Sequence, residues 1–536
     1  MATALVLASA PAASQEVGPP TLPGRDPRLP GLTQPSTATP PTLQTPAPAG
    51  VAPVPSATGP SPRIRVREIR VTGSTVFSAQ DFEVLTAPFV GRDVTAEDLS
   101  ALRQALTLKY VQAGYINSGA LLPDQTVADG LIEYRIVEGA LQDIQVTGTA
   151  HLDPDYVRDR LALGAAAPLN VNTLQETLQR LLQGPFIERV NAELAPGDRP
   201  GEARLIARVQ EGPRSRVTAS LDNDLSPSLG ALRAGLRGQW LNPRGRGDIL
   251  GWDLAYAQGY AKGSVSYSMP LDARDTTLDV FADLSRASVV ESPLNALDIQ
   301  SRAQTLGVRV TRPVFRDART QFVLSLGLDV RHSQSSLLGT GFAFSPGVEP
   351  DGESRVRVLR FVQDYTTRAS NQVTALRSTI SWGLGILGAT ELGNGQPGGK
   401  FLSWLGQAQH ARRLGTTDSQ LVLRFDAQLT NKPLLPLEQF AVGGLRTVRG
   451  FRTNQLVRDY GYAASAELRV PVLRSQDGGA VLQLVPFVDV GGAWTKGVSR
   501  LDRPRWPAPA SACGTTPRRA CMPSCTGPRP SAVAIS

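Results

Sequence analysis

The most suggestive polar residue of this 536-residue chain is an arginine placed between valine and glycine in a long glycine-rich segment. Val448, Arg449, Gly450 and Phe451 lie within the run EQFAVGGLRTVRGFRTNQLVRDYGY. A guanidinium held in a confined space needs a carboxylate partner, because an unpaired charge removed from water is costly. The chemistry that this segment offers is therefore ion pairing, and the partner must come from another part of the chain.

A candidate partner lies in the run LVPFVDVGGAW, where Phe487, Asp489 and Gly491 occupy alternate positions. Side chains two residues apart on a strand point to the same face of the sheet. A bidentate pair between Arg449 and Asp489 would pin the loop to that strand. Gly450 would let the loop backbone approach the wall closely. The alternative is an arginine in a surface loop with an unrelated partner.

No other pattern of residues predicts catalysis or a cofactor. The three histidines lack the spacing to one another, or to cysteine, that a zinc site requires. The run GLGILG at 383–388 spells a dinucleotide fingerprint, but a loop rather than a helix follows it. We therefore expect no enzymatic activity, no catalytic residue, no metal site and no cofactor.

Composition argues against nucleic-acid binding and in favour of an oxidising compartment. The formal net charge is +8, yet the basic residues are scattered among acidic ones and form no cluster, so we expect no nucleic-acid partner. Residues 1–512 contain no cysteine, and all three cysteines follow, at Cys513, Cys521 and Cys525. A long cysteine-free chain suits a compartment in which stray thiols would oxidise.

Alternation of apolar and polar residues dominates the chain from residue 213 to residue 494. In LDVFADLS (278–285), Val280 and Leu284 share one face, whereas Asp279 and Asp283 share the other. About thirteen such segments occur, each near the ten residues that a tilted strand needs to cross a bilayer. An apolar outer face and a charged inner face favour an antiparallel transmembrane β-barrel. A soluble β-sandwich is the alternative.

An internal repeat precedes this region. The run EIRVTGSTVFSAQDF (68–82) returns as DIQVTGTAHLDPDY (143–156), and each copy ends on an apolar strand that closes with Glu-Gly, at 131–139 and 203–212. Between these strands, helical spacing predicts a longer helix in each copy. Each copy therefore predicts strand, short helix, longer helix, strand and strand, which is a small α+β module used twice.

The residues that predict the longer helices also predict where they begin. The apolar positions are Leu99, Leu102, Leu106 and Tyr110 in the first copy, and Leu174, Leu178, Leu181 and Leu182 in the second. Thr95, followed three residues later by Asp98, forms a capping pair for the first helix. Asn172 or Thr173 would cap the second helix.

The N-terminal residues predict no packed domain. Residues 1–17 fit a clipped export signal, with an unstructured tail as the alternative, and the proline-rich residues 18–62 fit a semi-extended linker. The expected organisation is a signal segment at 1–17, a linker at 18–62, modules at 63–139 and 140–212, a barrel at 213–494 with a lumen loop at about 430–460, and a tail at 495–536.

The two repeats, the Val-Arg-Gly-Phe loop and the Phe-x-Asp-x-Gly strand together resemble the outer-membrane transporters of two-partner secretion, the hemolysin secretion/activation family. The repeats are similar to POTRA (polypeptide-transport-associated) modules, and the features occur in the family's order over residues 64–494. The resemblance implies a sixteen-stranded barrel in the bacterial outer membrane, with two POTRA-like modules in the periplasm. It also implies that the loop before strand twelve enters the lumen and carries Arg449 to Asp489 on strand thirteen.

The implied function is a translocation pore that exports a large β-helical adhesin or hemolysin, unfolded and without ATP. Its partners would be outer-membrane lipid and the exoprotein, whose N-terminal secretion domain the modules would bind by adding a strand to a sheet edge. Two alternatives stay open. A barrel-assembly factor of the same superfamily usually carries three or more modules, and a passive porin would lack the periplasmic repeats.

The sequence departs from the family pattern at both ends. Many members carry a plug helix before the first module, whereas prolines from residue 19 onward leave little room for one here. Residues 495–536 show no alternation, so we expect no strand after Trp494 and about three family strands to be missing. A frameshift is our hypothesis, because one codon choice for ACGTTPRRACMPSCTGP, translated in another frame, gives the alternating LRYDASPGLHAELYWA. Resequencing the gene would test it.

Overall fold

The computed structural model describes residues 42–44, 63–497 and 512–516, apart from positions 126, 128, 224, 318, 394, 416–418 and 475–479. The chain folds into two compact units, formed mainly by residues 38–214 and by residues 215–536. Within the described part of the chain, no helix has the length and apolar character needed to cross a membrane. The predicted signal segment, most of the linker and any plug helix lie outside the described residues.

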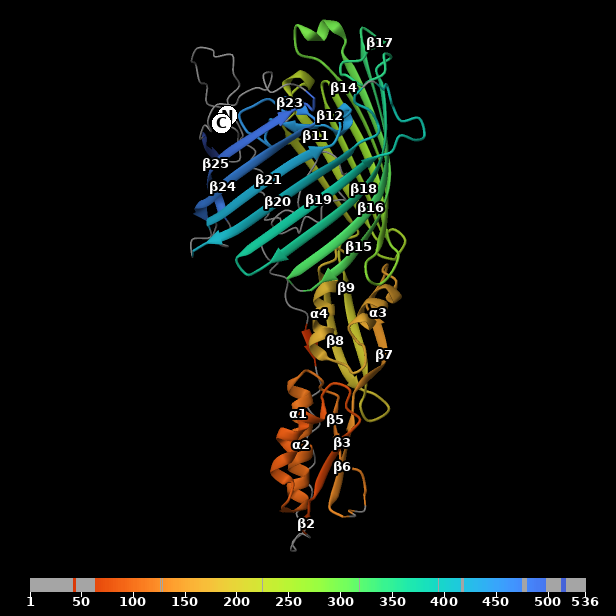
Figure 1. Cartoon of the computed structure of the whole chain (residues 1–536), viewed down its shortest axis with the longest axis vertical. Coiled ribbons are helices and arrows are strands. Elements are labelled where there is room, and N and C mark those ends of the chain that lie inside the picture. The colour runs from red at the N-terminus through yellow and green to blue at the C-terminus, as the bar shows by residue number, and fades with distance from the viewer. Residues whose placement is uncertain are drawn as a thin grey trace, which may run out of the picture. The chain divides into compact units, whose positions relative to one another are not determined.

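The first repeat folds as two helices beside a three-stranded sheet (Figure 1). Its elements are β3 (Glu68–Thr72), α1 (Ala79–Thr86), α2 (Ala96–Gln112), β5 (Gly119–Leu121) and β6 (Leu131–Val137), with the short additions β2 (Ile64–Arg65), η1 (Ala87–Phe89) and β4 (Asp93–Val94). The predicted order of strand, short helix, longer helix, strand and strand is confirmed. The predicted cap is also confirmed, since Asp98 N donates to Thr95 Oγ1 and Thr95 N donates to Asp98 Oδ2.

The core of this module forms between α2 and β6. The four predicted apolar positions of α2 are all buried, and they meet buried side chains of the central strand, Ile132, Tyr134 and Ile136. Each buried side chain of this size contributes about 1.5–3 kcal/mol relative to an exposed one. The Tyr134 hydroxyl donates to Leu99 O at 2.9 Å, which satisfies its buried polar group.

The second repeat has the same order of elements. They are β7 (Ala140–Thr147), α3 (Pro154–Leu163), α4 (Val171–Leu182), β8 (Ile187–Pro196) and β9 (Glu202–Glu211), and the short β1 (Thr42–Gln44) pairs in parallel with β8. The predicted cap of the longer helix was wrong, because α4 begins after Asn170. The Asn170 side chain accepts from Asn172 N at 2.9 Å and donates to Ala113 O at 3.0 Å. Asn170 therefore caps α4 and also ties the two repeats together.

The Glu-Gly endings of the repeats have a structural reason. Glu138 Oε1 accepts hydrogen bonds from the backbone N–H groups of Thr75 at 2.7 Å and Val76 at 3.1 Å. Glu211 Oε1 accepts from three successive N–H groups at 2.7–2.8 Å, those of Ala150, His151 and Leu152. In both repeats, one carboxylate therefore satisfies the backbone donors of the turn that leads into the first helix.

The Val-Thr-Gly motif of each repeat forms the start of that same turn. Gly73 and Gly148 have φ angles of +82° and +86°, in the left-handed region that side chains other than glycine avoid. A Cβ atom at Gly73 would lie 2.6 Å from Ile136 O, and one at Gly148 would lie 2.3 Å from Val209 O. Only glycine fits these positions, which explains why the motif recurs in the sequence.

We expect the two glutamates to make the modules sensitive to acid. Burial acts to raise the pKa of Glu211, but the hydrogen bonds from Leu152, His151 and Ala150 outweigh it, and the pKa lies below its ordinary value of 4.5. A carboxylate with a lower pKa in the folded state stabilises the fold above its unfolded pKa. That contribution, about 1 kcal/mol after solvent screening, is lost as the pH falls through the folded value.

The measurement is hydrogen exchange of the amides at 150–152 between pH 7 and pH 3, expressed as protection factors. Protection in the wild type should fall with the pH, whereas the Glu211→Gln variant should start lower and change little. A profile that stays flat in the wild type would contradict the prediction. The same test applies to Glu138, where burial is again outweighed, by hydrogen bonds from Thr75, Tyr110 and Val76, and the pKa is lowered.

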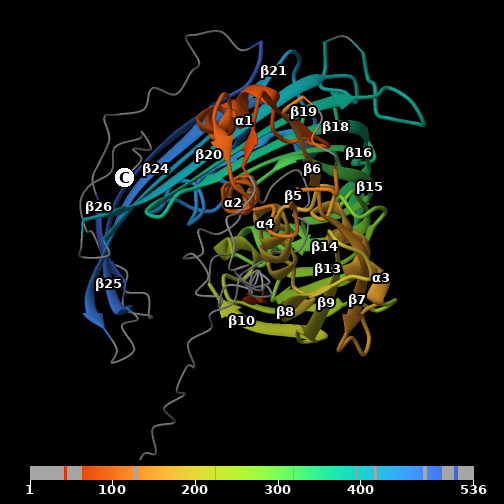
Figure 2. The same cartoon turned by 90° about the horizontal axis from the view of Figure 1, so that it is seen from below.

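The second unit contains a 15-stranded antiparallel sheet that curls round on itself (Figure 2). Its long strands are β10 (Ser215–Asp222), β11 (Arg233–Leu241), β12 (Ile249–Ala257), β13 (Tyr260–Pro270), β14 (Thr277–Ser288), β15 (Gln300–Arg316), β16 (Thr320–Leu337), β18 (Glu353–Arg368), β19 (Gln372–Gly383), β20 (Leu402–Leu414), β21 (Ser419–Thr430), β24 (Tyr460–Arg474) and β25 (Ala480–Trp494). Short elements lie between them, namely η2 (Pro227–Leu229), η3 (Leu294–Leu297) and β17 (Thr340–Gly341). Each long strand pairs with the next along the chain.

The two faces of this sheet differ as the alternation predicts. On β14, Val280 and Leu284 are 43% and 57% exposed, whereas Asp279 between them is 6% exposed. The outward face is thus an apolar surface, which lipid can cover, and the inward face carries the charged side chains. The predicted assignment of faces on this strand is confirmed.

The tail contributes one more strand, which the sequence did not predict. β26 (Ala512–Thr516) pairs antiparallel with residues 483–487 of β25. The expectation of no strand after Trp494 was therefore wrong. Strand pairing uses backbone N–H and C=O groups, so an open edge can be extended by residues without an alternating pattern. The frameshift hypothesis was based on residues 512–528, of which 517–528 lie outside the described part of the chain.

Candidate functional site

The candidate site is the loop between β21 and β24, residues 431–459, which we call the lumen loop. It contains η4 (Pro436–Glu438) and a small hairpin of β22 (Phe440–Val442) and β23 (Leu456–Arg458). Buried Phe440, Val442 and Val448 pack against Ala463 of β24 and Ala493 of β25. The loop therefore lies against the inward face of the sheet, held partly by apolar contact.

Arg449 and Asp489 meet in the arrangement that the sequence predicts. Arg449 Nε donates to Asp489 Oδ2 and Nη2 donates to Oδ1, each at 2.6 Å. The backbone N–H of Arg449 also donates to Oδ2, at 3.0 Å. Asp489 is completely buried. Two parallel charge-assisted bonds fix both the position and the orientation of the loop.

Three further groups around Arg449 complete the contact. Arg449 Nη1 donates to Glu467 Oε1 at 2.9 Å, and Nη2 donates to Ser465 Oγ at 2.9 Å. The guanidinium carbon lies 3.6 Å from the ring centroid of Phe487, a cation–π contact. Phe487 was predicted from its place on the strand, but Glu467 and Ser465 were missed. The cross-strand register, which pairs them with Phe487 and Asp489, is the signal that identifies them.

The structure gives the two glycines separate roles. Gly450 has φ +90°, so the turn itself requires glycine there. The close approach occurs at Gly491, where a Cβ atom would lie 3.0 Å from side-chain carbons of both Val442 and Val448. Val448 is completely buried, and Phe451 packs partly buried against the same apolar cluster. All seven predicted residues thus lie in or beside this one contact.

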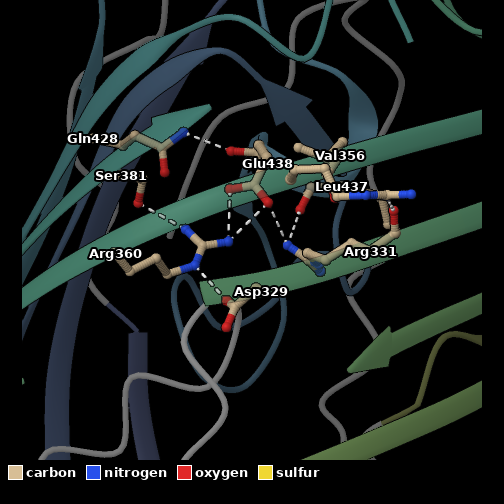
Figure 3. Close-up of polar contacts among 9 residues, drawn as sticks. Asp329, Arg331, Val356, Arg360, Ser381, Gln428, Leu437 and Glu438 are labelled. Carbon is tan, nitrogen blue, oxygen red and sulfur yellow. Dashed lines mark hydrogen bonds and ion pairs between the residues drawn. The ribbon is translucent and has the colours of Figure 1, made fainter. Parts of the chain in front are cut away.

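A second polar cluster holds the start of the lumen loop, and the sequence did not reveal it (Figure 3). Glu438 Oε1 accepts from Arg360 Nη2 at 2.8 Å and from Arg331 Nη1 at 2.6 Å. Arg360 in turn donates to Asp329 Oδ2 and to Ser381 Oγ, both at 2.7 Å. The carboxylates and guanidiniums of this cluster balance in charge, and burial of charge is tolerated only with such pairing. Glu438 lies 78 residues from Arg360, so local sequence carries no signal of the contact.

One acidic group in the described residues has the proximity that a metal ion needs. It consists of Glu349, Asp351 and Glu353. Glu349 and Glu353 are already engaged in ion pairs with Arg355.

Comparisons with known proteins agree on one family. The model of the haemolysin secretion/activation protein ShlB/FhaC/HecB matches residues 201–514, and the model of the ShlB-type POTRA domain matches residues 64–139. The outer membrane transporter CdiB-2 of Burkholderia pseudomallei is 24% identical over 442 residues, covering 76% of this chain and 69% of the relative.

Solved structures show the same fold. CdiB from Escherichia coli aligns with a TM-score of 0.62 at 21% identity, covering 85% of this chain and 84% of that one. BamA from Haemophilus ducreyi, lacking POTRA domains 1–3, aligns with a TM-score of 0.50 at 14% identity, covering 81% of this chain and 87% of that one. The fold is therefore a POTRA domain followed by a large antiparallel β-sheet like those of the CdiB and BamA barrels.

Proposed function

Because the chain belongs to the haemolysin secretion/activation family, we propose that it is an outer-membrane transporter that exports a partner exoprotein from the periplasm to the cell surface. The observation that carries this proposal is the lumen loop, which Arg449 pins to the inward face of a sheet whose outward face is apolar. A loop held by a few polar contacts can act as a gate, because releasing those contacts frees it to move.

The repeats and the large sheet divide the chain into domains with separate roles. We assign residues 63–139 and 140–212 as two POTRA-like modules, residues 213–494 as the barrel and 495–536 as a tail. The second module lies outside the POTRA match, but it shares the element order, the Glu211 contact and the left-handed Gly148 with the first. The first sheet has the order β3-β6-β5, so an extended segment of the exoprotein can add to its edge strand.

The partner and the mode of transport complete the proposal. The substrate class is a large exoprotein of the adhesin or hemolysin type, whose N-terminal secretion domain the modules bind and which passes through unfolded and without ATP. The outward apolar face contacts lipid, and no nucleic acid is involved. The polar clusters described above are paired charges that hold a loop in place, which fits a transporter rather than an enzyme.

The test is to co-express the chain with a large exoprotein gene from the same genome, in bacteria that lack other exporters of this family. We expect exoprotein on the cell surface with the full chain, and exoprotein retained in the periplasm when residues 63–212 are deleted. Ion conductance without any export would point to a passive porin. Loss of other barrels from the outer membrane, without an effect on the exoprotein, would point to an assembly factor. This alternative is based on the similarity of the fold to that of BamA.

A further inference from the structure

The lumen loop has two ends that contact different parts of the sheet. Its first part, residues 431–438, is here called the foot, and residues 440–458 are called the tip. The foot is bound by side chains of β16, β18 and β21, whereas the tip is bound by side chains of β24 and β25. The contacts of the foot and those of the tip can break independently, because the two parts of the loop bond to different side chains of the sheet.

The foot is the more deeply buried of the two. The side chains of Arg360, Glu438 and Asp329 are 4%, 4% and 1% exposed, whereas that of Arg449 in the tip is 18% exposed. Apolar contacts add to this anchor. Leu434 and Leu435 are fully buried in a cluster with three side chains of the sheet and of the loop before β20, namely Val356, Val358 and Phe401.

Backbone contacts fasten the foot further. Arg331 Nη1 donates to Leu437 O at 2.7 Å, and Gln428 Nε2 donates to Glu438 O at 3.0 Å. Asp459, where the loop returns to the sheet, accepts from Leu434 N through Oδ1 at 3.0 Å. Gln439 is the residue that joins the foot to the tip, and its side chain also donates to Asp459 Oδ1, at 3.1 Å.

We propose that Glu438 is a positioning residue for transport: held by Arg360 and Arg331, it keeps the foot in place while only the tip swings out of the pore. This inference rests on the proposed function, in which the lumen loop lies in the route of the exoprotein. The stationary foot limits how far the released tip can travel and returns it to Asp489 after transport. Opening therefore needs the Arg449 contact to break, but not the Glu438 contact.

The test is hydrogen exchange of the full chain in lipid nanodiscs, without any exoprotein. Arg449→Ala should speed exchange at the tip amides of 443–454 at least tenfold and leave the foot amides of 434–438 within twofold of the wild type. Glu438→Gln should do the reverse. Asp489→Asn serves as a second tip variant in case Arg449→Ala does not fold, and the amides of β12 and β13 report any general loss of barrel stability.

Two results would overturn the proposal. Faster exchange in the foot of the Arg449→Ala protein would mean that the loop moves as one body. Unchanged exchange in the foot of the Glu438→Gln protein would mean that Glu438 does not position it. Because no exoprotein is present, neither result depends on whether the chain exports one.

Single-channel conductance in planar bilayers gives a readout that a general structural defect would not reproduce. We expect Glu438→Gln alone to conduct like the wild type, Arg449→Ala to conduct more, and the double variant to conduct more than Arg449→Ala. Equal conductance of the double variant and Arg449→Ala would contradict a foot that stays behind in the lumen. Silence of every variant would instead count against the pore function, and the exchange data would still decide the inference.

Discussion

Replacing Arg449 with alanine is expected to reduce export of the exoprotein at least tenfold while the barrel still folds. The change leaves the fully buried Asp489 facing Glu467 without the guanidinium that now bonds to both. Breaking a buried ion pair by removing one partner costs about 3–5 kcal/mol, and each 1.4 kcal/mol changes an equilibrium about tenfold. The tip should therefore leave β24 and β25 and lose the contact with Asp489 to which it returns after each round of transport, so the pore should conduct ions more readily while export of the exoprotein falls. Surface exoprotein, quantified by protease release from intact cells, is the measurement.

Arg452 provides a matched control three residues further along the same loop. Its side chain is 62% exposed and pairs with Glu291, and exposed pairs of this kind contribute little to stability. Arg452→Ala should export within about twofold of the wild type, because a solvent-exposed ion pair is screened and its loss changes little. Folding of every variant can be checked by the gel mobility of unheated samples. Equal export by the two alanine variants would show that the contact with Asp489 is not needed for transport.

Truncating Leu106 to alanine is expected to unfold the first module and thereby abolish export, while leaving the barrel intact. Leu106 is completely buried between α2 and the sheet. Removing a buried leucine side chain costs about 2–5 kcal/mol, which is a large share of the stability of so small a module. Because the barrel belongs to a separate compact unit, single-channel conductance should persist.

The control for this prediction lies two residues along the same helix. Leu108 is 52% exposed, and alanine is the better helix former, so Leu108→Ala should change stability by less than about 0.5 kcal/mol. Hydrogen exchange of the module amides distinguishes the two variants directly. Full protection and normal export in the Leu106→Ala protein would show that the module core tolerates the cavity or that the module is not required.

Local patterns in the sequence were enough to predict the elements and their faces. Asp279 points inward and Leu284 points outward. Successive side chains of any strand point to opposite faces of the sheet, so this alternation can be predicted without knowing which strands are adjacent. The repeated helices were predicted for the same reason, because spacing of three and four residues defines one face of a helix. The cap of α4 was predicted at the wrong residue, because Asn170 also donates to Ala113 O in the other repeat, a contact that the local sequence does not indicate.

Long-range contacts were predictable only where a motif marked both partners. Arg449 and Asp489 stand in two recognisable runs, so their pairing could be predicted across 40 residues. Glu467 stands in no such run. Glu438 begins the same run as Arg449, but its partners Arg360 and Arg331 lie in none. The tail strand β26 was missed as well, because its pairing depends on the open edge of β25 and not on its own side chains.

The sequence by itself determined that this chain forms two α+β modules and a large sheet with one apolar and one charged face, because those features depend on residues a few positions apart. It also indicated that Arg449 needs an acidic partner. Only the tertiary structure decided that Glu438 meets Arg360 and Arg331, which are 78 and 107 residues away. The curvature of the whole sheet brings β16 and β18 to the start of the lumen loop, and no local pattern encodes that curvature.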